Sequence, residues 1–480
     1  MKRALRWFDY ITINIYWFAL STRAQLLSSL LLPLLVQQFV GEETKGSAVG
    51  VIRLWALMIA VLFQAFMGIL SDRSTLRFGR RRPFILIGAI GEIIIVTFIG
   101  FTSNLEGFTG YAAIFALYLL SMCVSNTAQA AAQGLIPDLV PEARRGLASG
   151  VKAFLEVPVP VIFVSLVLGK MVAGGNFWGS IVILLVILAV SCAVSMFIPE
   201  EPITTPPYPA DWKGFSRLLL MTAAFTLIIL GLGWLTGLVM DWANTLSPEA
   251  RLAVTLLAGL TGMTIAIGMG VGASLKLGLG SDMNAHPAFT WWVVNRLTFL
   301  VGSTNLASFV VFFMQERFPD LPKEKAAAPA STLIMFVGIF ILLSSLPGGW
   351  LADRVGKKPL IALAGVLGAA GTALIIFTTD PLLMNIGGSI IGAGVGLFYA
   401  SSWALGTSLV PKEQAARYLG LSNLAGAGAG AIGAYIGGPI GDSVGYLPLM
   451  SIFGLLFIIS IAALVFIRPS SAQISGRSHA

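Results

Sequence analysis

The chain has 480 residues, of which 56% are hydrophobic and 11% are charged, and its mean hydropathy is +0.87. Soluble domains carry about 25% charged residues, so this composition excludes an ordinary soluble domain. The 30 Lys and Arg residues outnumber the 22 Asp and Glu residues and give a net charge of +8 at pH 7.

Apolar runs of roughly 18 residues or more recur along the whole length, and each is long enough to cross a bilayer as a helix. The alternation of apolar and polar residues that is typical of outer-membrane strands is absent. We therefore predict an all-α, polytopic membrane protein. Apolar runs and the breakers between them predict about 14 transmembrane helices, at 12–38, 47–71, 83–103, 109–136, 147–172, 177–198, 216–241, 250–275, 288–315, 330–352, 358–379, 382–409, 416–440 and 446–467.

Two loops between predicted helices repeat one pattern of residues. The first reads GILSDRSTLRFGRRRP and the second reads GGWLADRVGKKP. We name them the first and second latch loops, because a duplicated acidic-then-basic loop between membrane helices indicates a conformational latch in a twofold repeated transporter. The candidate gating residues are Gly68, Asp72, Arg73, Gly79, Arg80 and Arg81 in the first loop, and Gly349, Asp353, Arg354, Gly356, Lys357 and Lys358 in the second.

The repeat also predicts the domain organisation. Asp72 and Asp353 are 281 positions apart, and a second echo places Pro141 and Pro411 270 positions apart. Both offsets exceed the length of a six-helix half by roughly the length of an insertion, which begins with a proline-rich loop. We therefore predict an N-terminal six-helix bundle at 1–198, a linker with two extra transmembrane helices at 199–287, interpreted as a peripheral spacer, and a C-terminal six-helix bundle at 288–480.

The basic residues gather on one side of the predicted helices. We assign about 21 of the 30 Lys and Arg residues to that side and about seven to the other. Cytoplasmic loops carry such an excess, so we expect a multi-pass protein of the cell membrane with both termini and both latch loops in the cytoplasm. The cluster RFGRRRP is then a membrane-flanking segment, not a nucleic-acid-binding one.

The latch loops resemble the signature loops of the major facilitator superfamily, between helices 2 and 3 and again between helices 8 and 9. The expanded first copy, SDR…RFGRRRPFI, resembles the sucrose transporter and glycoside–pentoside–hexuronide cation symporter group, as do NTAQAAAQGLIPDL and WWVVNRLTFLVG. The resemblance covers both halves but not 199–287. It implies a fold of two six-helix bundles around a central site. It also implies secondary transport of a small polar solute, a sugar or glycoside, by proton or sodium symport through alternating access.

The chain departs from this group at two charged positions of helix 4. Plant-type sucrose carriers have an Asp where this chain has Met122, and an Arg where it has Gln133. Both charged groups are linked with proton coupling in that group, so the resemblance does not supply the coupling site.

Charged residues inside the predicted spans are candidates for coupling, because a charge in hydrocarbon is costly. Arg23 lies in the middle of helix 1, and Glu156 lies at a similar depth of ~13 Å in helix 5, at 1.5 Å per residue. Helices 1 and 5 are neighbours in the resembled fold, and helix 3 is peripheral. We therefore predict an Arg23–Glu156 pair as the coupling element, with a permanent structural ion pair as the alternative. For Glu92 in helix 3 we expect packing or a helix–helix hydrogen bond.

Amide and aromatic side chains in the spans suit a sugar, because amides bond hydroxyl groups and aromatic faces stack on sugar rings. The helix 4 amides share one face by their i, i+3, i+7 spacing. Arg296, in the predicted span 288–315, lies near the cytoplasmic third of the membrane and could belong to a gate instead. The candidate substrate-binding residues are Gln25, Asn126, Gln129, Gln133, Asn295, Arg296, Asn305, Tyr399, Trp403 and Asn423.

Cysteines and histidines form no pattern for a metal, a disulfide framework or catalysis. Cys123 and Cys192 lie in apolar stretches, and His286 and His479 lie in a loop and in the tail. We therefore expect no cofactor, no metal site and no enzymatic activity. The expected partners are the solute, the coupling cation and the lipid bilayer, and we expect a monomer.

Two other functions remain open. Fourteen helices also occur in drug–proton antiporters that export apolar compounds, but helix 5 here reads FLEVPVPVIFVSLVLG and lacks their glycine-rich signature. A non-transporting membrane assembly factor on the same fold is the other alternative. Two intact latch loops argue against it, because a static scaffold needs neither.

Overall fold

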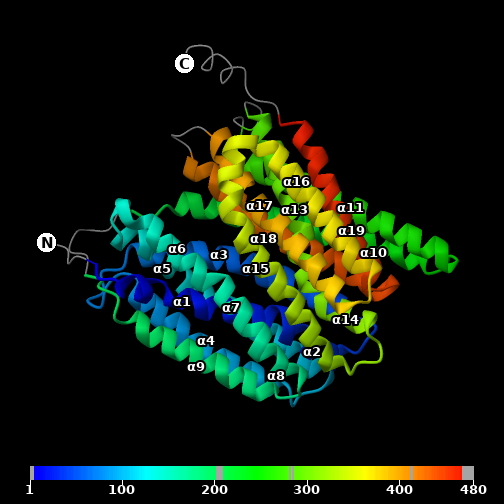
Figure 1. The fold of residues 1–480 in the computed structure, drawn as a ribbon, viewed down its shortest axis with the longest axis horizontal. Helices are drawn as coiled ribbons and strands as arrows, with labels where there is room; N and C mark the ends of the chain where they lie inside the picture. The colour runs from blue at the N-terminus through cyan, green and yellow to red at the C-terminus, as the bar shows by residue number, and fades with distance from the viewer. Residues whose placement is uncertain (1–4, 202–208, 281–282, 284–285, 411–414, 468–480) are drawn as a thin grey trace, which may run out of the picture. The chain divides into compact units, whose positions relative to one another are not determined.

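The computed structural model describes residues 5–201, 209–280, 283, 286–410 and 415–467, without the side chains of 415–425. The chain order of its helices is shown in Figure 1. The first predicted span contains α1 (Asp9–Ala24), η1 (Gln25–Leu31) and α2 (Leu32–Val40), and the next three are α3 (Lys45–Asp72), α4 (Arg82–Thr102) and α5 (Gly107–Leu139). The fifth contains η2 (Glu142–Arg144), α6 (Arg145–Glu156), α7 (Pro158–Phe163), η3 (Val164–Leu168) and α8 (Gly169–Ala173). The sixth is α9 (Phe177–Ser195).

The remaining spans follow the predicted order. They are α10 (Trp212–Ala243), α11 (Pro248–Leu279), α13 (Pro287–Ser308) with α14 (Val310–Arg317), α15 (Ala327–Val355) preceded by η4 (Lys323–Ala326), α16 (Lys357–Phe377), α17 (Pro381–Leu409), α18 (Ala415–Val444) and α19 (Tyr446–Val465).

The predicted all-α membrane fold is confirmed. Within the described residues, 12 helical segments are long and apolar enough to cross a membrane, or up to 13 when α13 and α14 are taken as one span bent by 57°. That count does not include α18. The helix boundaries lie within a few residues of those that the apolar runs predict.

The interruptions inside spans have local causes. A π-helical turn over Gln25–Leu31 precedes Pro33, whose ring lacks an N–H and clashes with the carbonyl four residues earlier. In the fifth span α6 ends at Glu156, and Pro158 begins α7 after Val157, which has φ −115° and ψ −72°. Pro158 and Pro160 have no N–H to donate to the preceding turn, so the sequence VPVP breaks this span.

The helices group into two compact units. Unit 1 contains residues 1–216 and 310–338, and unit 2 contains 217–309 and 339–480. The bend at Phe309 is therefore the place where the chain leaves unit 2 and α14 joins the helices of unit 1. The predicted division at 198 and 287 stays a prediction.

Small residues allow close helix contacts within unit 1. A Cβ atom on Gly88 of α4 would lie 2.7 Å from the carbonyl oxygen of Val124 on α5, so only glycine fits at this crossing. The helices α4 and α9 run side by side (Figure 1). This packing brings α1, α4 and α5 together around a buried polar cluster, which is described below.

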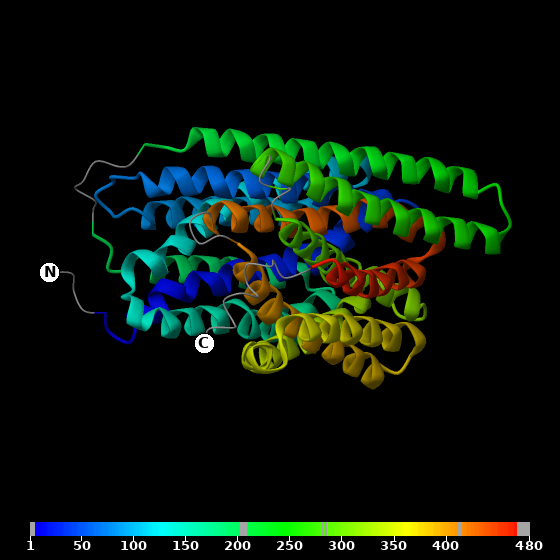
Figure 2. The same cartoon turned by 90° about the horizontal axis from the view of Figure 1, so that it is seen from above.

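In unit 2 the two helices of the insertion form an antiparallel pair, drawn in green in Figure 2. They pack on the glycine-rich α18, where Phe225 of α10 contacts the positions of Gly270 on α11 and Gly428 on α18. These contacts show that the glycines of α18 allow neighbouring helices to approach closely. The interpretation of the pair as a peripheral spacer stays a prediction.

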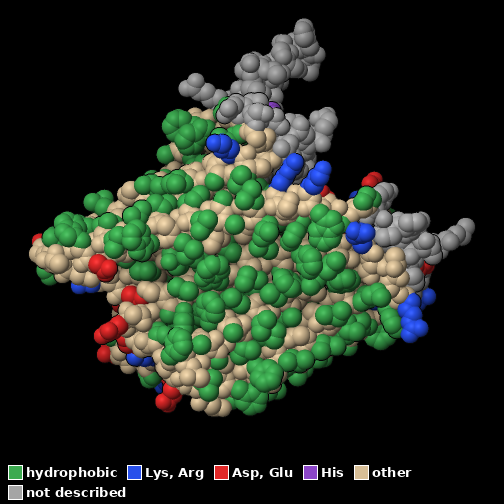
Figure 3. Space-filling model, turned by 180° about the vertical axis from the view of Figure 1, so that it is seen from behind, with side chains coloured by type: hydrophobic (Ala, Val, Ile, Leu, Met, Phe, Trp, Pro, Cys, Tyr) green, Lys and Arg blue, Asp and Glu red, His purple; other side chains and the backbone are tan. Residues whose placement is uncertain are grey.

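The outer surface suits a lipid environment. Figure 3 shows a face on which hydrophobic side chains predominate and charged side chains gather at its margins. Large exposed apolar residues such as Phe98, Leu227 and Phe377 are 55%, 68% and 85% accessible. Exposed apolar surface on this scale is typical of a protein whose solvent is the bilayer.

Candidate functional site

The first latch loop is held by a network of ion pairs within unit 1. Arg81 pairs with Asp72 at 2.5 Å and with Asp138 of α5 at 2.9 Å, and Arg80 also pairs with Asp138. The backbone N–H groups of Arg81 and Arg82 donate to the Glu200 carboxylate at 2.7 and 3.0 Å. The loop thus joins the ends of α3, α4 and α5 to the chain that follows α9.

Two further features explain this geometry. Gly79 has φ +102°, a conformation that disfavours side chains, and a Cβ atom there would also meet the Glu200 side chain. Arg81 is buried, and its guanidinium also donates to the hydroxyl of Ser71 at 2.9 Å. Arg73 of the same loop is exposed, and Gly68 has open space around its Cβ position.

The second latch loop is not paired in the same way. Asp353 is exposed and has no ion-pair partner among the residues that the structure describes. Lys357 donates to the Ala404 carbonyl at 2.9 Å, Lys358 donates to the Ile467 carbonyl, and Arg354 lies 4.2 Å above the Trp350 ring. Gly356 has φ +101° and repeats the backbone role of the glycine in the first loop.

The sequence explains this difference between the copies. The offset of 270 that relates Pro141 to Pro411 places Ser408 at the position equivalent to Asp138. The second half therefore lacks the carboxylate that binds two arginines in the first half. The gating role of both loops stays a prediction.

The predicted Arg23–Glu156 pair is wrong. Arg23 Nε instead donates to Glu92 Oε1 at 2.6 Å, and these side chains are only 4% and 1% exposed. Glu156 pairs with Lys152 at 3.4 Å, one turn earlier on α6. The prediction used depth and the expected contact between helices 1 and 5, but the i, i+4 spacing gives Glu156 a partner on its own helix.

The prediction for Glu92, a helix–helix hydrogen bond, is confirmed. Ser121 of α5 donates to Glu92 Oε1 at 2.6 Å, and Arg23 also donates to the Ser121 hydroxyl. Met122 of α5 lies where the resembled sucrose carriers have an Asp, and its Sδ atom is 4.0 Å from Arg23 Nη1. The Oε2 atom of Glu92 is buried without a hydrogen-bond partner among the described residues. We name Arg23, Glu92 and Ser121 the buried triad.

The substrate candidates of unit 1 differ in exposure along their helices. Asn126 is buried and donates to the Met122 carbonyl of its own helix at 2.8 Å. Gln129 is half-buried and Gln133 is exposed, while Gln25 lies half-buried in η1. Asn126 therefore has a structural partner already, and the substrate role of Gln25, Gln129 and Gln133 stays a prediction.

The substrate candidates of unit 2 fall into two groups. Asn295 donates to the Ser460 carbonyl at 2.8 Å and Asn305 to the Ala429 carbonyl at 3.1 Å, so both amides already join helices. Arg296 is buried, with Trp292 and Trp403 beside it. Tyr399 precedes Trp403 by one turn of α17, and both remain about two-fifths exposed. The side chain of Asn423 lies outside the described residues.

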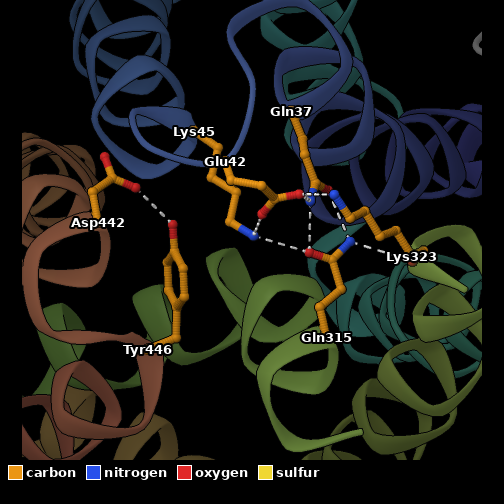
Figure 4. Close-up of polar contacts among 7 residues, drawn as sticks. All are labelled: Gln37, Glu42, Lys45, Gln315, Lys323, Asp442 and Tyr446. Atoms are coloured by element: carbon orange, nitrogen blue, oxygen red, sulfur yellow. Dashed lines mark hydrogen bonds and ion pairs between the residues drawn. The ribbon is translucent and has the colours of Figure 1, made fainter. Parts of the chain in front are cut away.

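A polar network in unit 1 was not predicted from the sequence. Gln37 and Gln315 exchange two amide hydrogen bonds, of 3.0 and 2.8 Å, and Lys45 donates to Glu42 at 2.7 Å and to Gln315 at 3.2 Å (Figure 4). Lys323 also pairs with Glu42. We name these five residues the far-end network, because Lys45 and Asp72 are the first and last residues of α3, roughly 40 Å apart at 1.5 Å per residue.

The network fixes the ionisation of its carboxylate. Burial raises the pKa of Glu42, but hydrogen bonds from Lys323, Lys45 and Gln37 outweigh it and lower the pKa from 4.5 to about 2. The carboxylate is thus charged throughout the neutral range. No sequence signal relates Gln37 to Gln315, which are 278 positions apart.

Sequence reasoning also missed Arg53, which lies inside the span of α3. Its Nη1 donates to the Ser28 carbonyl at 3.4 Å, and its Nε is buried without a partner among the described residues. The rule that intramembrane charges are functional candidates would have identified it, because the residue lies in the ninth position of that helix.

Comparison with known proteins gives a family match along nearly the whole chain. The family model described as Major Facilitator Superfamily matches residues 17–322 and 318–479. The crystal structure of the nucleoside transporter NupG has a TM-score of 0.65 and 14% identity, and the match covers 96% of this chain and 100% of that one. A crystal structure of the peptide transporter POT in complex with sulfate has a TM-score of 0.65 at 14% identity, and covers 99% and 96%. At such identities the likeness shows the fold alone.

Curated relatives match over shorter stretches. The minor myo-inositol transporter IolF of Bacillus subtilis is 32% identical over 120 residues, which are 25% of this chain and 27% of that protein. The sucrose transport protein SUC3 of Arabidopsis thaliana is 33% identical over 108 residues, 19% of this chain and 18% of that protein. The chain thus spans about a quarter or less of the length of these relatives.

Proposed function

Because the chain belongs to the major facilitator superfamily, a family of membrane transporters, we propose that it is a secondary active transporter of a sugar or a related polyol or glycoside, driven by proton symport. The solute class is supported by the relatives named for inositol and sucrose transport, and by the latch and helix 4 segments that resemble the sugar symporters. The exposed amide of Gln133, the half-buried amides of Gln25 and Gln129, and the partly exposed rings of Tyr399 and Trp403 suit such a solute.

The observation that carries the coupling proposal is the Arg23–Glu92 contact. A buried carboxylate can take up a proton when its charge partner is drawn away, and the loss of charge then weakens the contact. Glu92 keeps one carboxylate oxygen free of partners within the described part of the chain. Arg23 contacts both Glu92 of α4 and Met122 of α5, which supports the proposal that α4 supplies the carboxylate that α5 lacks.

We further propose that the two polar networks of unit 1 act as gates at opposite ends of α3. The first latch network joins the ends of α3, α4 and α5, and the far-end network joins the start of α3 to α14 and η4. Alternating access requires contacts that close one end while the other opens. Charge-assisted hydrogen bonds suit such contacts, because they are strong in a dry site and are replaced by water when the site opens.

Uptake by purified protein in proteoliposomes tests this function. The panel consists of radiolabelled myo-inositol, sucrose, xylose and glucose, each with an inward proton gradient, an inward sodium gradient or neither. We expect saturable uptake of at least one member that rises with the proton gradient, compared with protein-free liposomes. Uptake of none of them, or uptake that responds only to sodium, contradicts the proposal.

A further inference from the structure

The hydroxyl group of Tyr16 is buried on the face of α1 that carries Arg23. Tyr16 is 1% exposed, and its Oη atom has no hydrogen-bond partner among the residues that the structure describes. The two residues are seven positions apart, which places them two turns apart on one face of the helix. Helical side chains lean toward the N-terminus, so Arg23 leans toward Tyr16. The charges of Glu92 and Arg23 both act on the Tyr16 hydroxyl, which therefore lies beside the buried triad.

Glu92 contributes an unpaired oxygen to the same cluster. Its Oε1 atom accepts hydrogen bonds from Arg23 Nε and from the Ser121 hydroxyl, both at 2.6 Å. Its Oε2 atom is buried without a partner in the described part of the chain. Buried polar atoms are rarely left unpaired in folded proteins, and exceptions often belong to functional groups. Two such atoms in one cluster therefore indicate a bond that forms in another protonation state.

The chemistry of a protonated Glu92 defines that bond. Because Oε1 is occupied by two donors, the proton is expected on Oε2, where it creates a new O–H group. A buried O–H group needs an acceptor, and the Arg23 guanidinium has donors only. The Ser121 hydroxyl lies on the Oε1 side, where it donates to Glu92 and accepts from Arg23. The oxygen of Tyr16 is an acceptor that no other residue of the described chain engages.

We infer that Tyr16 positions the coupling proton, because its Oη atom accepts a hydrogen bond from the Oε2–H group of protonated Glu92. The inference rests on the proposed function and adds a residue to its proton step. Glu92 takes the proton from water on the side where the solute enters and returns it to water on the other side, while Tyr16 keeps its own hydrogen throughout. In this conformation Glu92 is paired with Arg23, and no bond joins it to Tyr16. The bond thus stabilises the protonated state alone.

The groups that face α1 from neighbouring helices do not replace Tyr16 as the acceptor. The Cys192 thiol of α9 also acts on the Tyr16 hydroxyl, and the Met122 thioether of α5 contacts the triad. Both sulfur atoms are weak acceptors. Lys152 of α6 faces α1 as well, but an ammonium has donors only, and this one is paired with Glu156.

The test removes the Tyr16 oxygen and keeps its ring. Tyr16→Phe takes away no hydrogen bond of this conformation, so the variant should fold and should melt at the wild-type temperature at neutral pH. Uptake into proteoliposomes is then measured at external pH values from neutral to acidic. The solute is the member of the myo-inositol, sucrose, xylose and glucose panel that the wild type accumulates.

The expected effect is confined to proton binding. A buried donor without its acceptor is costly, so we expect the proton concentration for half-maximal uptake to rise about fivefold or more in Tyr16→Phe. Exchange of labelled solute at equal acidic pH on both sides should remain. A smaller rise, no change or a fall overturns the inference. Loss of exchange together with uptake, or a variant that does not fold, also overturns it, because the hydroxyl would then have a structural role in this conformation.

The matched control is Tyr10→Phe. Tyr10 is also on α1, is 5% exposed, and has a buried hydroxyl without a partner among the described residues. It lies six residues before Tyr16, so the two side chains occupy different faces of the helix. We expect the control to keep the proton dependence of the wild type. An equal shift in both variants excludes a specific role for Tyr16.

Failure of this inference can be separated from failure of the proposed function. Wild-type uptake that ignores the proton gradient refutes the proposed function before any variant is compared. Proton-driven uptake by the wild type, with the same proton dependence in Tyr16→Phe, refutes the inference about Tyr16 alone.

Discussion

Gln37 and Gln315 bond each other reciprocally, each side-chain amide donating to the oxygen of the other at 3.0 and 2.8 Å. Gln37 lies in the last turn of the first span, and Gln315 lies on α14, beyond the bend at Phe309. This pair brings segments 278 positions apart into one network within unit 1. The contact is specific, because a carboxylate or an aliphatic side chain at either position cannot both donate and accept.

Loss of this pair should open the far end more often. Each hydrogen bond contributes about 1 kcal/mol, so Gln37→Leu should shift the closed-to-open ratio by about fivefold or more for each bond that is lost. The shift is measured by spin-label distances across the far end in reconstituted protein. The matched control is Gln38→Leu, because Gln38 is the exposed neighbour whose amide bonds only the Ser103 carbonyl. A distance distribution that is unchanged in Gln37→Leu contradicts the gate role.

The far-end network should stabilise the protein equally across the neutral pH range and should lose this stabilisation in acid. Because the pKa of Glu42 is lowered to about 2 from 4.5, its contribution to stability is full above pH 4.5 and is lost as the pH falls toward 2. The melting temperature should therefore fall between pH 5 and pH 3 by more in the wild type than in Glu42→Gln. Thermal unfolding in detergent across this range measures the difference. Identical pH profiles of the melting temperature in the two proteins would refute the claim that the ionised Glu42 carboxylate stabilises the protein.

The two latch loops should differ in their sensitivity to mutation. Asp138→Asn weakens the contacts of two arginines, one of them buried, and should lower the free energy of unfolding by about 2 kcal/mol. Asp353→Asn removes an exposed carboxylate that has no ion-pair partner in the described part of the chain, so its effect should stay within about 0.5 kcal/mol. Thermal melts of both variants test this asymmetry. Equal destabilisation would show that the second loop has contacts which this conformation lacks.

The buried triad should show strong coupling between its two charges. Removing one partner of a buried ion pair costs about 3–5 kcal/mol, because the other charge is left alone. Glu92→Gln should therefore destabilise the protein strongly, and the double change Arg23→Gln with Glu92→Gln should recover most of the loss. A double-mutant cycle of unfolding free energies measures the coupling. Additive effects of the two single changes would mean that the ion pair contributes nothing to stability.

The sequence predicted the fold much better than the contacts within it. Helices followed from apolar length, and the latch loop from its repeated Asp and Arg. The partner of Arg23 did not follow, because depth along a helix does not define which face a side chain occupies, and Glu92 of α4 lies closer than Glu156 of α6. The Gln37–Gln315 pair depends on the bend at Phe309, which no proline or glycine at that residue indicates.

The central claim, that solute moves together with a proton through Glu92, is tested most directly by solute-induced proton flux. The transported solute is added outside proteoliposomes that contain a pH-sensitive dye, with the same pH on both sides of the membrane. The account predicts acidification of the lumen in the wild type and in Glu156→Gln. It predicts none in Glu92→Gln, although that variant still exchanges labelled solute. Proton flux that persists in Glu92→Gln, or that is absent in the wild type while solute enters, would contradict it.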